Sequence, residues 1–373
     1  MRIAHLTYSY RPLRGGADVY VEQLYQALAR AGHDQRIYQR PPGDTSPFLR
    51  LIPNPLRGLP AEFWTQALFL PLRWLALAHE QVIIAHYPHY LLTGWPFPRI
   101  LGGHRLIGFS HGVTWDDHPG SQRSRIKRAL HIAAVARSDV FVANDSHFLR
   151  EIGIPIPPRH GHYTQVAKGI WLIPNAVDTS YFCPGPPDPE VAKLHPILVP
   201  RNLYLNRGVH LAVQAFAEFA PYHPECFLLI AGEESDPAYT RWVHAMVKLL
   251  QVAPRVHFMG PVPHQQMRDL YRSAEMTLIP TLAGEGTSLS ALESMACGIA
   301  TISTNVAGLL DLPTYQAQPD PVALAQAMRE VYPKRAEIGW EQRKEVFSSY
   351  SLRRWEGTWR EVVQSALQSP RRL

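Results

Sequence analysis

Two carboxylates stand eight positions apart in the stretch EGTSLSALESMACG, with small residues that can begin a helix between them. Glu285 precedes that helix start, and Glu293 lies about two turns in, roughly 7 to 9 Å along the axis. The backbone N–H groups of residues 286–288 would be free there and would favour a phosphate. The spacing predicts a site for a ligand with a diphosphate between two sugars, whose hydroxyl groups donate to the two carboxylates. The alternative is a surface helix with two solvated glutamates.

Two arginines follow a strand-like segment in the stretch PILVPRNLYLNRGV. Arg201 comes at the end of this strand, and Arg207 comes at the start of the next helix. Ligands of open α/β sheets bind at the carboxyl ends of the strands, so both cations are expected on the ligand side. There they can clamp a diphosphate and neutralise the charge that develops when it leaves. A pair of solvated loop arginines is the alternative.

Two further features end strands nearer the N-terminus. Gly15 and Gly16 lie between a strand and a helix in YRPLRGGADVY, a turn that lets the backbone approach a ligand phosphate. His111 ends the strand-like segment RLIGFSHG, which places an imidazole at the same edge of the predicted sheet. An ordinary turn and a structural histidine are the alternatives.

The elements that must position these residues alternate between strand and helix along the chain, which predicts parallel sheets covered by helices. The first helix is predicted over residues 17–31 from its apolar spacing. A proline- and glycine-rich run, CPGPPDPE, begins at Cys183 and tolerates neither element. We therefore predict an α/β protein with a Rossmann-like domain over residues 1–183, a second over residues 184–350, and a helical segment over residues 351–373.

The composition indicates a folded globular protein, because 46% of the 373 residues are hydrophobic and 18% are charged. The net charge of +6 favours an anionic partner, such as a nucleoside diphosphate, nucleic acid or an acidic lipid surface. The three cysteines are far apart, and the N-terminus lacks the pattern of a signal peptide. No apolar run is long enough to span a membrane. A reducing, cytoplasmic location is therefore expected.

Several common motifs are missing from the sequence. The first turn lacks GxGxxG and the chain lacks a Walker A sequence, which counts against dinucleotide and P-loop sites. The basic residues are scattered, without a helix-turn-helix or stacking-aromatic signature, so we do not expect nucleic acid as a partner.

Four stretches together resemble the GT4 family of retaining glycosyltransferases, which have the GT-B fold: GGADVYVEQLYQALARAGH, PRNLYLNRGVHLAVQAF, IPNAVDTSYF and EGTSLSALESMACG. The Glu-x7-Glu pattern followed by SMACG is the most specific part, and the GGA turn is the least specific. The resemblance implies two Rossmann-like domains that face each other across a cleft. It implies that the first domain binds the acceptor, that the second binds the nucleotide-sugar donor, and that the last helix packs back on the first domain.

The resemblance also implies a role for each residue singled out above. Glu285 matches the residue that contacts hydroxyl groups of the transferred sugar, and Glu293 matches the one that holds the nucleotide ribose. Arg201 and Arg207 match the basic pair on the diphosphate, of which the second is usually a lysine with different donor geometry. His111 matches a histidine near the donor sugar.

By this resemblance the catalytic residues are His111, Glu285, Arg201 and Arg207. The donor-binding residues are Gly15, Gly16, Arg201, Arg207, Val262, Glu285, Gly286, Thr287, Ser288, Leu289 and Glu293. Among them, Gly16 matches a backbone contact to the phosphate, and Val262 falls where the base-binding loop usually is.

The implied reaction retains the anomeric configuration through front-face attack by the acceptor hydroxyl, while the departing diphosphate takes up its proton. Glu285 is then a positioning group rather than a nucleophile. The chain has no Asp-x-Asp pair, the metal handle of the other large glycosyltransferase fold, so we expect no metal and no cofactor. The family usually has a longer loop after the position of Gly308, so contacts just beyond it are not carried over.

The acceptor is expected to be a glycan, a glycolipid or a small molecule. Residues 60–80 are rich in Trp, Phe and Leu and are flanked by Arg57 and Arg73. A second stretch carries the basic residues Arg123, Arg125, Lys127 and Arg128. One interpretation is a peripheral contact with anionic lipid at the inner face of a membrane, which suits a lipid-linked acceptor. The other is a core helix beside a solvated basic helix, because Pro71 interrupts the first stretch.

Two other functions stay open at this point. One is another enzyme on the same fold, such as a nucleotide-sugar epimerase or a sugar phosphorylase. The other is a protein that binds a nucleotide sugar without catalysis.

Overall fold

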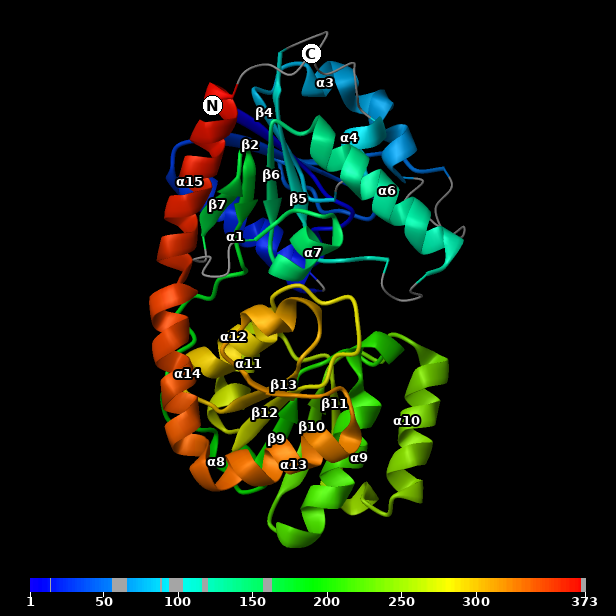
Figure 1. The fold of residues 1–373 in the computed structure, drawn as a ribbon, viewed down its shortest axis with the longest axis vertical. Helices are drawn as coiled ribbons and strands as arrows, with labels where there is room; N and C mark the ends of the chain where they lie inside the picture. Colours follow the sequence, from blue (N-terminus) through cyan, green and yellow to red (C-terminus); the bar gives the residue numbers. More distant parts are fainter. Residues whose placement is uncertain are drawn as a thin grey trace. The chain divides into compact units, whose positions relative to one another are not determined.

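The computed structural model describes residues 1–13, 15–55, 66–87, 89–93, 103–115, 120–156 and 163–369. The chain forms two compact units, which are coloured along the sequence in Figure 1. Unit 1 consists of Met1–Asn175 with Arg353–Leu373, and unit 2 consists of Ala176–Leu352.

The chain enters unit 2 after Asn175, which is earlier than the predicted boundary at Cys183. Val177 N donates a hydrogen bond to Tyr350 O at 3.0 Å, and Phe182 is buried in a hydrophobic cluster of unit 2. The segment before the proline-rich run therefore belongs to unit 2, because its backbone and its side chains are satisfied there.

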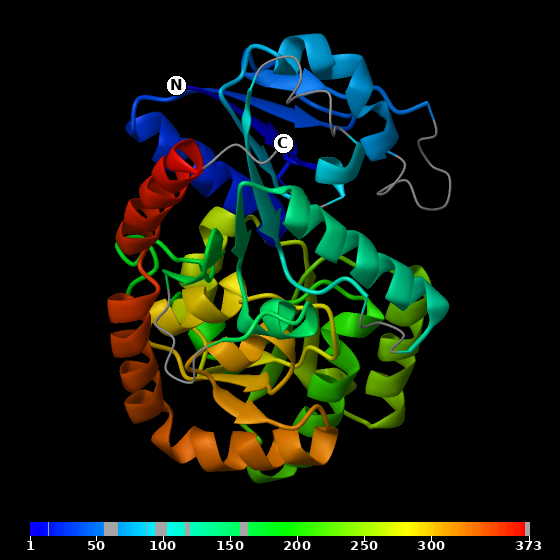
Figure 2. The same ribbon diagram turned by 45° about the horizontal axis from the view of Figure 1, so that its top comes forward.

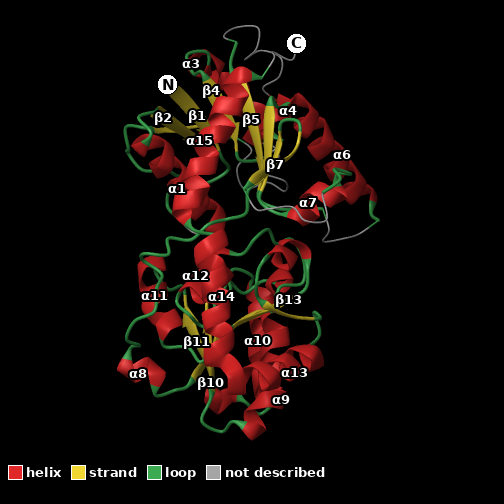
Figure 3. Ribbon diagram, turned by 60° about the vertical axis from the view of Figure 1, so that its left-hand side comes forward, coloured by secondary structure: helices red, strands yellow, loops and turns green. Residues whose placement is uncertain are grey.

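Among the described residues, unit 1 contains one eight-stranded sheet in the order β3-β2-β1-β4-β5-β6-β8-β7, parallel except for the β7–β8 pair. Its strands are β1 (Arg2–Leu6), β2 (Asp34–Gln39), β3 (Leu49–Leu51), β4 (Val82–Ala85), β5 (Arg105–Ser110), β6 (Val140–Ala143), β7 (Thr164–Ala167) and β8 (Ile170–Leu172). Its helices are α1 (Gly16–Arg30), η1 (Gln66–Arg73), α3 (Trp74–Leu77), α4 (Tyr90–Thr93), α6 (Gln122–Arg137), α7 (Ser146–Glu151) and α15 (Leu352–Gln368). Figure 3 labels the α-helices among them.

The first helix of unit 1 confirms the periodicity argument. α1 covers Gly16–Arg30, where a helix was predicted over residues 17–31. Val21, Leu24 and Leu28 form its buried face, because they recur at helical spacing.

The last helix, α15, packs beside α1 within unit 1 (Figures 2 and 3). Trp355 and Trp359 are fully buried, and both rings make edge contacts with Tyr20 of α1. Trp359 Nε1 also donates to Tyr20 Oη at 2.9 Å. The two tryptophans therefore pack the core of unit 1.

Among its described residues, unit 2 contains one six-stranded parallel sheet in the order β11-β10-β9-β12-β13-β14. Its strands are β9 (Pro196–Val199), β10 (Phe227–Ala231), β11 (Val256–Gly260), β12 (Met276–Ile279), β13 (Thr301–Thr304) and β14 (Tyr315–Ala317). Its helices are α8 (Pro189–Ala192), η2 (Leu205–Arg207), α9 (Val209–Phe219), η3 (Ala220–Tyr222), α10 (Pro237–Leu249), η4 (Ala253–Arg255), α11 (His264–Arg272), α12 (Leu289–Ala296), η5 (Ala307–Asp311), α13 (Pro321–Val331), η6 (Tyr332–Lys334) and α14 (Arg335–Ser349).

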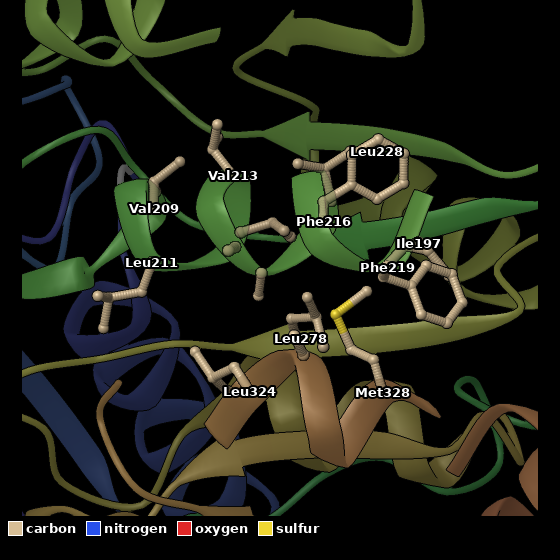
Figure 4. Packing of buried hydrophobic residues seen from close by; sticks show 14 of the residues in the cluster. Ile197, Val209, Leu211, Val213, Phe216, Phe219, Leu228, Leu278, Leu324 and Met328 are labelled. Atoms are coloured by element: carbon tan, nitrogen blue, oxygen red, sulfur yellow. The ribbon is translucent and has the colours of Figure 1, made fainter. Parts of the chain in front are cut away.

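A hydrophobic cluster fixes the helices of unit 2 on its sheet (Figure 4). Val213 and Phe216 of α9 are fully buried against Ile197 of β9. Leu324 and Met328 of α13 close the same cluster from the neighbouring helix. This packing holds the carboxyl end of β9, and the loop that follows it, on a rigid base.

Each sheet has a switch point between parallel strands at which the strand order reverses. In unit 1, β1 lies between β2 and β4, and in unit 2, β9 lies between β10 and β12. Doubly wound sheets bind ligands outside the carboxyl ends of the strands at this switch point. The loops after β1 and β4, and after β9 and β12, are therefore where a site is expected.

Candidate active site

Unit 2 gathers charged side chains at the carboxyl ends of β9 and β12. Arg201 follows β9 by two residues, and Glu285 lies in the loop between β12 and α12. Arg201 Nη1 lies 3.4 Å from Glu285 Oε1, and Arg201 Nη2 donates to Ser288 Oγ at 2.9 Å. The fold thus brings together residues that are far apart in the sequence, at the switch point of the sheet.

Arg207 reaches the other oxygen of the same carboxylate. It ends η2 and pairs with Glu285 Oε2, while its Nε donates to Tyr204 Oη at 2.6 Å. The loop that carries Arg207 is tied to the loop after β12, because Leu282 N donates to Asn206 O at 2.8 Å. The structure therefore places both predicted arginines on the predicted glutamate.

The ion cluster of Arg201, Arg207 and Glu285 has a positive balance of charge, and Arg207 is its partly exposed member. The side chains of Arg201 and Glu285 are 7% and 8% exposed. Burial lowers the pKa of Arg201 to about 10 and also lowers the pKa of Arg207, yet both stay protonated at neutral pH. Arg201 Nε is buried and has no hydrogen-bond partner among the described residues. A buried cation with an unused donor suits an anionic ligand.

The start of α12 lies against this ion cluster. Ser288 caps α12 with its Oγ, which accepts from Ala291 N at 3.4 Å, so the predicted helix start is confirmed. The neighbouring predicted residues are Gly286, Thr287 and Leu289. Gly308 N donates to Glu285 O at 3.0 Å, so the short loop at Gly308 supports the backbone of Glu285. The phosphate contact of residues 286–288 stays a prediction.

Glu293 lies further along α12 and is held by two residues of α11. His264 Nε2 lies 2.6 Å from Glu293 Oε1, and Tyr271 Oη donates to Glu293 Oε2 at 3.1 Å. The hydrogen bond with Glu293 raises the pKa of His264. Each carboxylate oxygen keeps a second lone pair, so Glu293 is oriented and can still accept from a ligand hydroxyl.

His264 and Tyr271 were not predicted as site residues. The sequence signal for them is their spacing of seven residues, which would put both polar side chains on one face of a helix. Val262 lies two residues before α11 and packs, partly buried, on the core of unit 2. Its predicted contact with the base stays a prediction.

Unit 1 carries the two predicted glycines at the start of α1. Gly15 caps α1, and its N–H donates to Asp18 Oδ2 at 3.3 Å within the helix cap. Gly16 is the first residue of α1, directly after the loop that leaves β1. The predicted contact between Gly16 and a phosphate stays a prediction.

His111 lies directly after β5 in unit 1, enclosed by aromatic rings. The ring centroids of Phe109, Tyr20 and Tyr87 lie 4.6, 5.3 and 5.3 Å from that of His111. Burial lowers the pKa of His111 to about 3, so the imidazole is neutral at physiological pH. His111 is therefore suited to hydrogen bonding rather than to binding an anion as a cation.

The described residues include neither a metal-binding cluster nor a membrane-spanning helix. No group of three or more His, Cys, Asp or Glu side chains is arranged to hold a metal ion in the described part of the chain. None of the described helices is both long and apolar enough to cross a bilayer. The independence from metals and cofactors stays a prediction.

Comparison with known proteins identifies relatives for both units. Residues 15–165 match a glycosyl transferase 4-like domain, and residues 196–333 match a family described as glycosyl transferases group 1. The D-inositol 3-phosphate glycosyltransferase of Acidothermus cellulolyticus is 28% identical over 334 residues, which cover 79% of this chain and 71% of that protein.

Solved structures with the same fold include two that cover nearly the whole chain. Sucrose-phosphate synthase from Thermosynechococcus elongatus has a TM-score of 0.81 at 21% identity, over 99% of this chain and 100% of that one. Anabaena HepE in complex with UDP-glucose has a TM-score of 0.77 at 14% identity, over 98% of this chain and 100% of that one.

Two doubly wound units, each matched by a glycosyltransferase domain, define a protein of the GT-B fold. Within that class, the chain belongs to the GT4-like glycosyltransferases and is an enzyme that transfers glycosyl groups. The fold class and the family predicted from the sequence are thus confirmed.

Proposed function

We propose that this enzyme moves a hexosyl group from a nucleoside diphosphate sugar to an acceptor hydroxyl, with retention of configuration and without a metal ion. The observation that carries the proposal is the ion cluster at the β9–β12 switch point, in which Arg201 keeps an unused buried donor. A diphosphate supplies the oxygens that two guanidinium groups bind. The solved complex of Anabaena HepE with UDP-glucose supports a nucleotide-sugar donor.

Donor binding exchanges one anion for another at the two arginines. In the structure, the Glu285 carboxylate pairs with both Arg201 and Arg207. When a diphosphate takes these contacts, the Glu285 carboxylate becomes available to hydroxyl groups of the transferred sugar. At the other end of the donor, Glu293 accepts hydrogen bonds from the ribose while His264 and Tyr271 hold it in place.

The acceptor hydroxyl attacks the anomeric carbon on the face from which the diphosphate leaves. The bond to the acceptor oxygen forms as the bond to the phosphate oxygen breaks, and the departing diphosphate takes the hydroxyl proton. Arg201 and Arg207 stabilise the charge on that oxygen. Glu285 positions the sugar, so no covalent intermediate forms on the protein.

Nucleotide-dependent stability tests this proposal. At about 100 times its dissociation constant, a ligand of the folded protein adds roughly 2.7 kcal/mol to the free energy of unfolding. We expect one series among UDP, GDP, ADP and CMP to do so in EDTA, and we expect Glu293→Gln to remove most of the gain. Glu330→Gln is the matched control, because Glu330 is an exposed glutamate of α13 that pairs with Tyr315.

The outcome separates the proposal from its alternatives. If no nucleotide stabilises the wild type, or if EDTA abolishes the effect, the metal-independent donor site is wrong. Sugar released as a phosphate ester, or inverted at a ring carbon, would favour a phosphorylase or an epimerase.

A leucine face on unit 1 further supports a peripheral membrane contact, for which we propose an anionic bilayer as the partner. Leu68, Leu72 and Leu75 are 59%, 66% and 83% exposed along η1 and α3, although the inward residues Leu70 and Leu77 are also apolar. A segment that is apolar on both faces is typical of one covered from outside.

Basic residues flank the leucine face of Leu68, Leu72 and Leu75. Arg73 ends η1 and donates from Nε and Nη2 to Leu51 O, beside the exposed Arg50 of β3. Helix α4 contacts both η1 and α6, and α6 exposes Arg123, Arg125 and Arg128. Two basic residues of α6 also support the fold, because Lys127 Nζ donates to Thr114 O and Arg128 Nε donates to Glu151 O. Arg57, also predicted for this surface, lies outside the described residues.

Vesicle binding tests the membrane contact. We expect the protein to sediment with vesicles of phosphatidylcholine and phosphatidylglycerol but not with phosphatidylcholine alone, and to be released by salt. Changing Leu72 and Leu75 together to serine should abolish sedimentation. Leu249→Ser is the control, because Leu249 of unit 2 is 82% exposed without belonging to this surface. Equal binding to both vesicle types, or equal loss in the control, would refute the proposal.

A further inference from the structure

Four polar side chains follow one another across the switch point of unit 1, and the proposed mechanism gives a role to none of them. Gln35 lies on β2, His5 on β1, His86 directly after β4 and His111 directly after β5. The strands β2, β1, β4 and β5 are consecutive neighbours in the sheet. Gln35, His5 and His86 are buried, so their polar atoms need hydrogen-bond partners. These partners determine which ring nitrogen of each histidine carries the proton.

The hydrogen bonds of Gln35 determine which atom donates in its hydrogen bond with His5. Gln35 Nε2 donates to Tyr25 O at 2.8 Å, which leaves Gln35 Oε1 to face His5 Nε2, also at 2.8 Å. An amide oxygen can accept but not donate, so His5 Nε2 carries the proton. Burial lowers the pKa of His5 to about 4, so the ring is neutral at pH 7 and its Nδ1 is a bare lone pair.

The same direction passes to His86. His86 Nε2 lies 3.1 Å from His5 Nδ1, so His86 Nε2 carries a proton and donates it to this hydrogen bond. Burial also lowers the pKa of His86 well below its usual value, so this ring is neutral and its Nδ1 is a bare lone pair. His86 Nδ1 is buried and has no partner within the described part of the chain.

His111 offers the matching atom. Its Nε2 is likewise buried without a partner among the residues that the structure describes. The rings of His86 and His111 are nearly parallel, at 21°, with centroids 6.0 Å apart. A small ring rotation would bring His111 Nε2 into direct contact with His86 Nδ1, and hydrogen bonds at catalytic sites often shorten when substrate binds.

We propose that Gln35, His5 and His86, named the histidine chain, are positioning residues that hold His111 as a hydrogen-bond acceptor toward a substrate hydroxyl. Each link donates inward, from His111 Nε2 to His86, then to His5 and Gln35. The histidine chain ends at the backbone carbonyl of Tyr25, which can only accept, so the donor direction of the hydrogen bonds is fixed. His111 Nδ1 then presents a lone pair to the ligand.

This polarity has a consequence for specificity, which rests on the proposed function and on the resemblance that places His111 near the donor sugar. A lone pair on His111 Nδ1 favours a sugar hydroxyl and disfavours a group that can only accept, such as a carboxylate or a phosphate oxygen. The rings of Tyr20, Tyr87 and Phe109 enclose His111. Burial raises the pKa of Tyr87, and the nearby carboxylate of Asp18 on α1 contributes to this rise. A neutral acceptor histidine therefore keeps its polarity through the physiological pH range.

Nitrogen-15 spectra of histidine-labelled protein test the polarity directly. We expect His5, His86 and His111 to be neutral with the proton on Nε2, and His5 and His86 to remain so as the pH falls from 8 to about 5. A His86 with its proton on Nδ1, or one that titrates near its ordinary pKa, would overturn the proposal. This readout does not depend on activity, so it stands apart from a failure of the proposed function.

Variants connect the histidine chain to turnover. Gln35→Met keeps the side-chain volume but removes the acceptor for His5, and we expect mixed tautomers with kcat lowered about 10-fold while the donor KM is nearly unchanged. The matched control is Gln39→Met, which removes another buried amide of β2 that bonds to Arg11. This control should leave the histidine spectra as in the wild type.

A rescue pair excludes a merely structural effect. In His5→Asn, the side-chain oxygen takes the place of His5 Nδ1 and can still accept from His86, whereas His5→Phe cannot. We expect kcat to be mostly retained in the first and lost about 10-fold in the second. Equal activity of the two variants, or wild-type spectra in Gln35→Met, would refute the proposed role of the chain.

Discussion

Glu285→Gln is expected to separate ligand binding from catalysis. Glutamine keeps the shape of Glu285 but removes the charge that pairs with Arg201 and Arg207. Removing one partner of a buried ion pair leaves uncompensated charge, and we expect the free energy of unfolding to fall by about 3 kcal/mol. A diphosphate replaces the missing anion, so UDP or inorganic pyrophosphate should stabilise the variant more than it stabilises the wild type.

Glycosyl transfer by Glu285→Gln should become slower, although the variant gains more stability from diphosphate than the wild type does. The charged hydrogen bond from Glu285 to a sugar hydroxyl is lost, and we expect kcat/KM to fall about 10- to 100-fold. Denaturant unfolding with and without pyrophosphate, followed by initial rates, measures both effects. In the control Glu330→Gln, the free energy of unfolding should change by less than about 0.5 kcal/mol. If pyrophosphate stabilised Glu285→Gln no more than the wild type, Glu285 would not compete with the diphosphate.

The main parts of this site could be predicted from sequence because they follow one rule. Parallel strands end at the same edge of a sheet, so residues directly after strands, such as Arg201 and Glu285, are brought together by topology alone. The cap at Ser288 is equally local, because a serine before an apolar helical run satisfies free N–H groups. These predictions needed the order of elements but no side-chain packing.

The partners that hold the site could not be predicted in the same way. His264 lies on α11, which contacts α12, and no local pattern reveals that it bonds to Glu293. His5 stands in the apolar strand segment RIAHLTY, where a histidine is an irregularity, but its bonds to Gln35 and His86 depend on strand order. The boundary near Cys183 was misplaced for a similar reason, because chain composition does not reveal which core a segment joins.

Gly208→Ala adds a single methyl group near the donor site, and we expect it to lower both the stability of the protein and its affinity for nucleotide. Gly208 links η2 to α9 with φ of +65°, and a Cβ there would lie 1.8 Å from Pro280 O. That contact is with backbone, so the loop that carries Arg207 must move away from the loop after β12. The strained backbone and the displaced loop together should lower the free energy of unfolding by about 3 kcal/mol or more. Because Arg207 then leaves Glu285, nucleotide affinity should fall more than about 10-fold.

Gly260→Ala separates the close approach from the backbone conformation. Gly260 has φ of +67° in the same unit, yet a Cβ there would meet nothing within 4 Å. This control should lose only about 1 kcal/mol, the usual cost of a left-handed alanine, and should bind nucleotide normally. Denaturant unfolding and nucleotide titration of both variants compare the two costs. If both variants lost the same stability, the left-handed backbone conformation alone would explain why glycine is needed at position 208. A larger loss of stability and of nucleotide affinity in Gly208→Ala would mean that the close approach of Gly208 to Pro280 keeps Arg207 near Glu285.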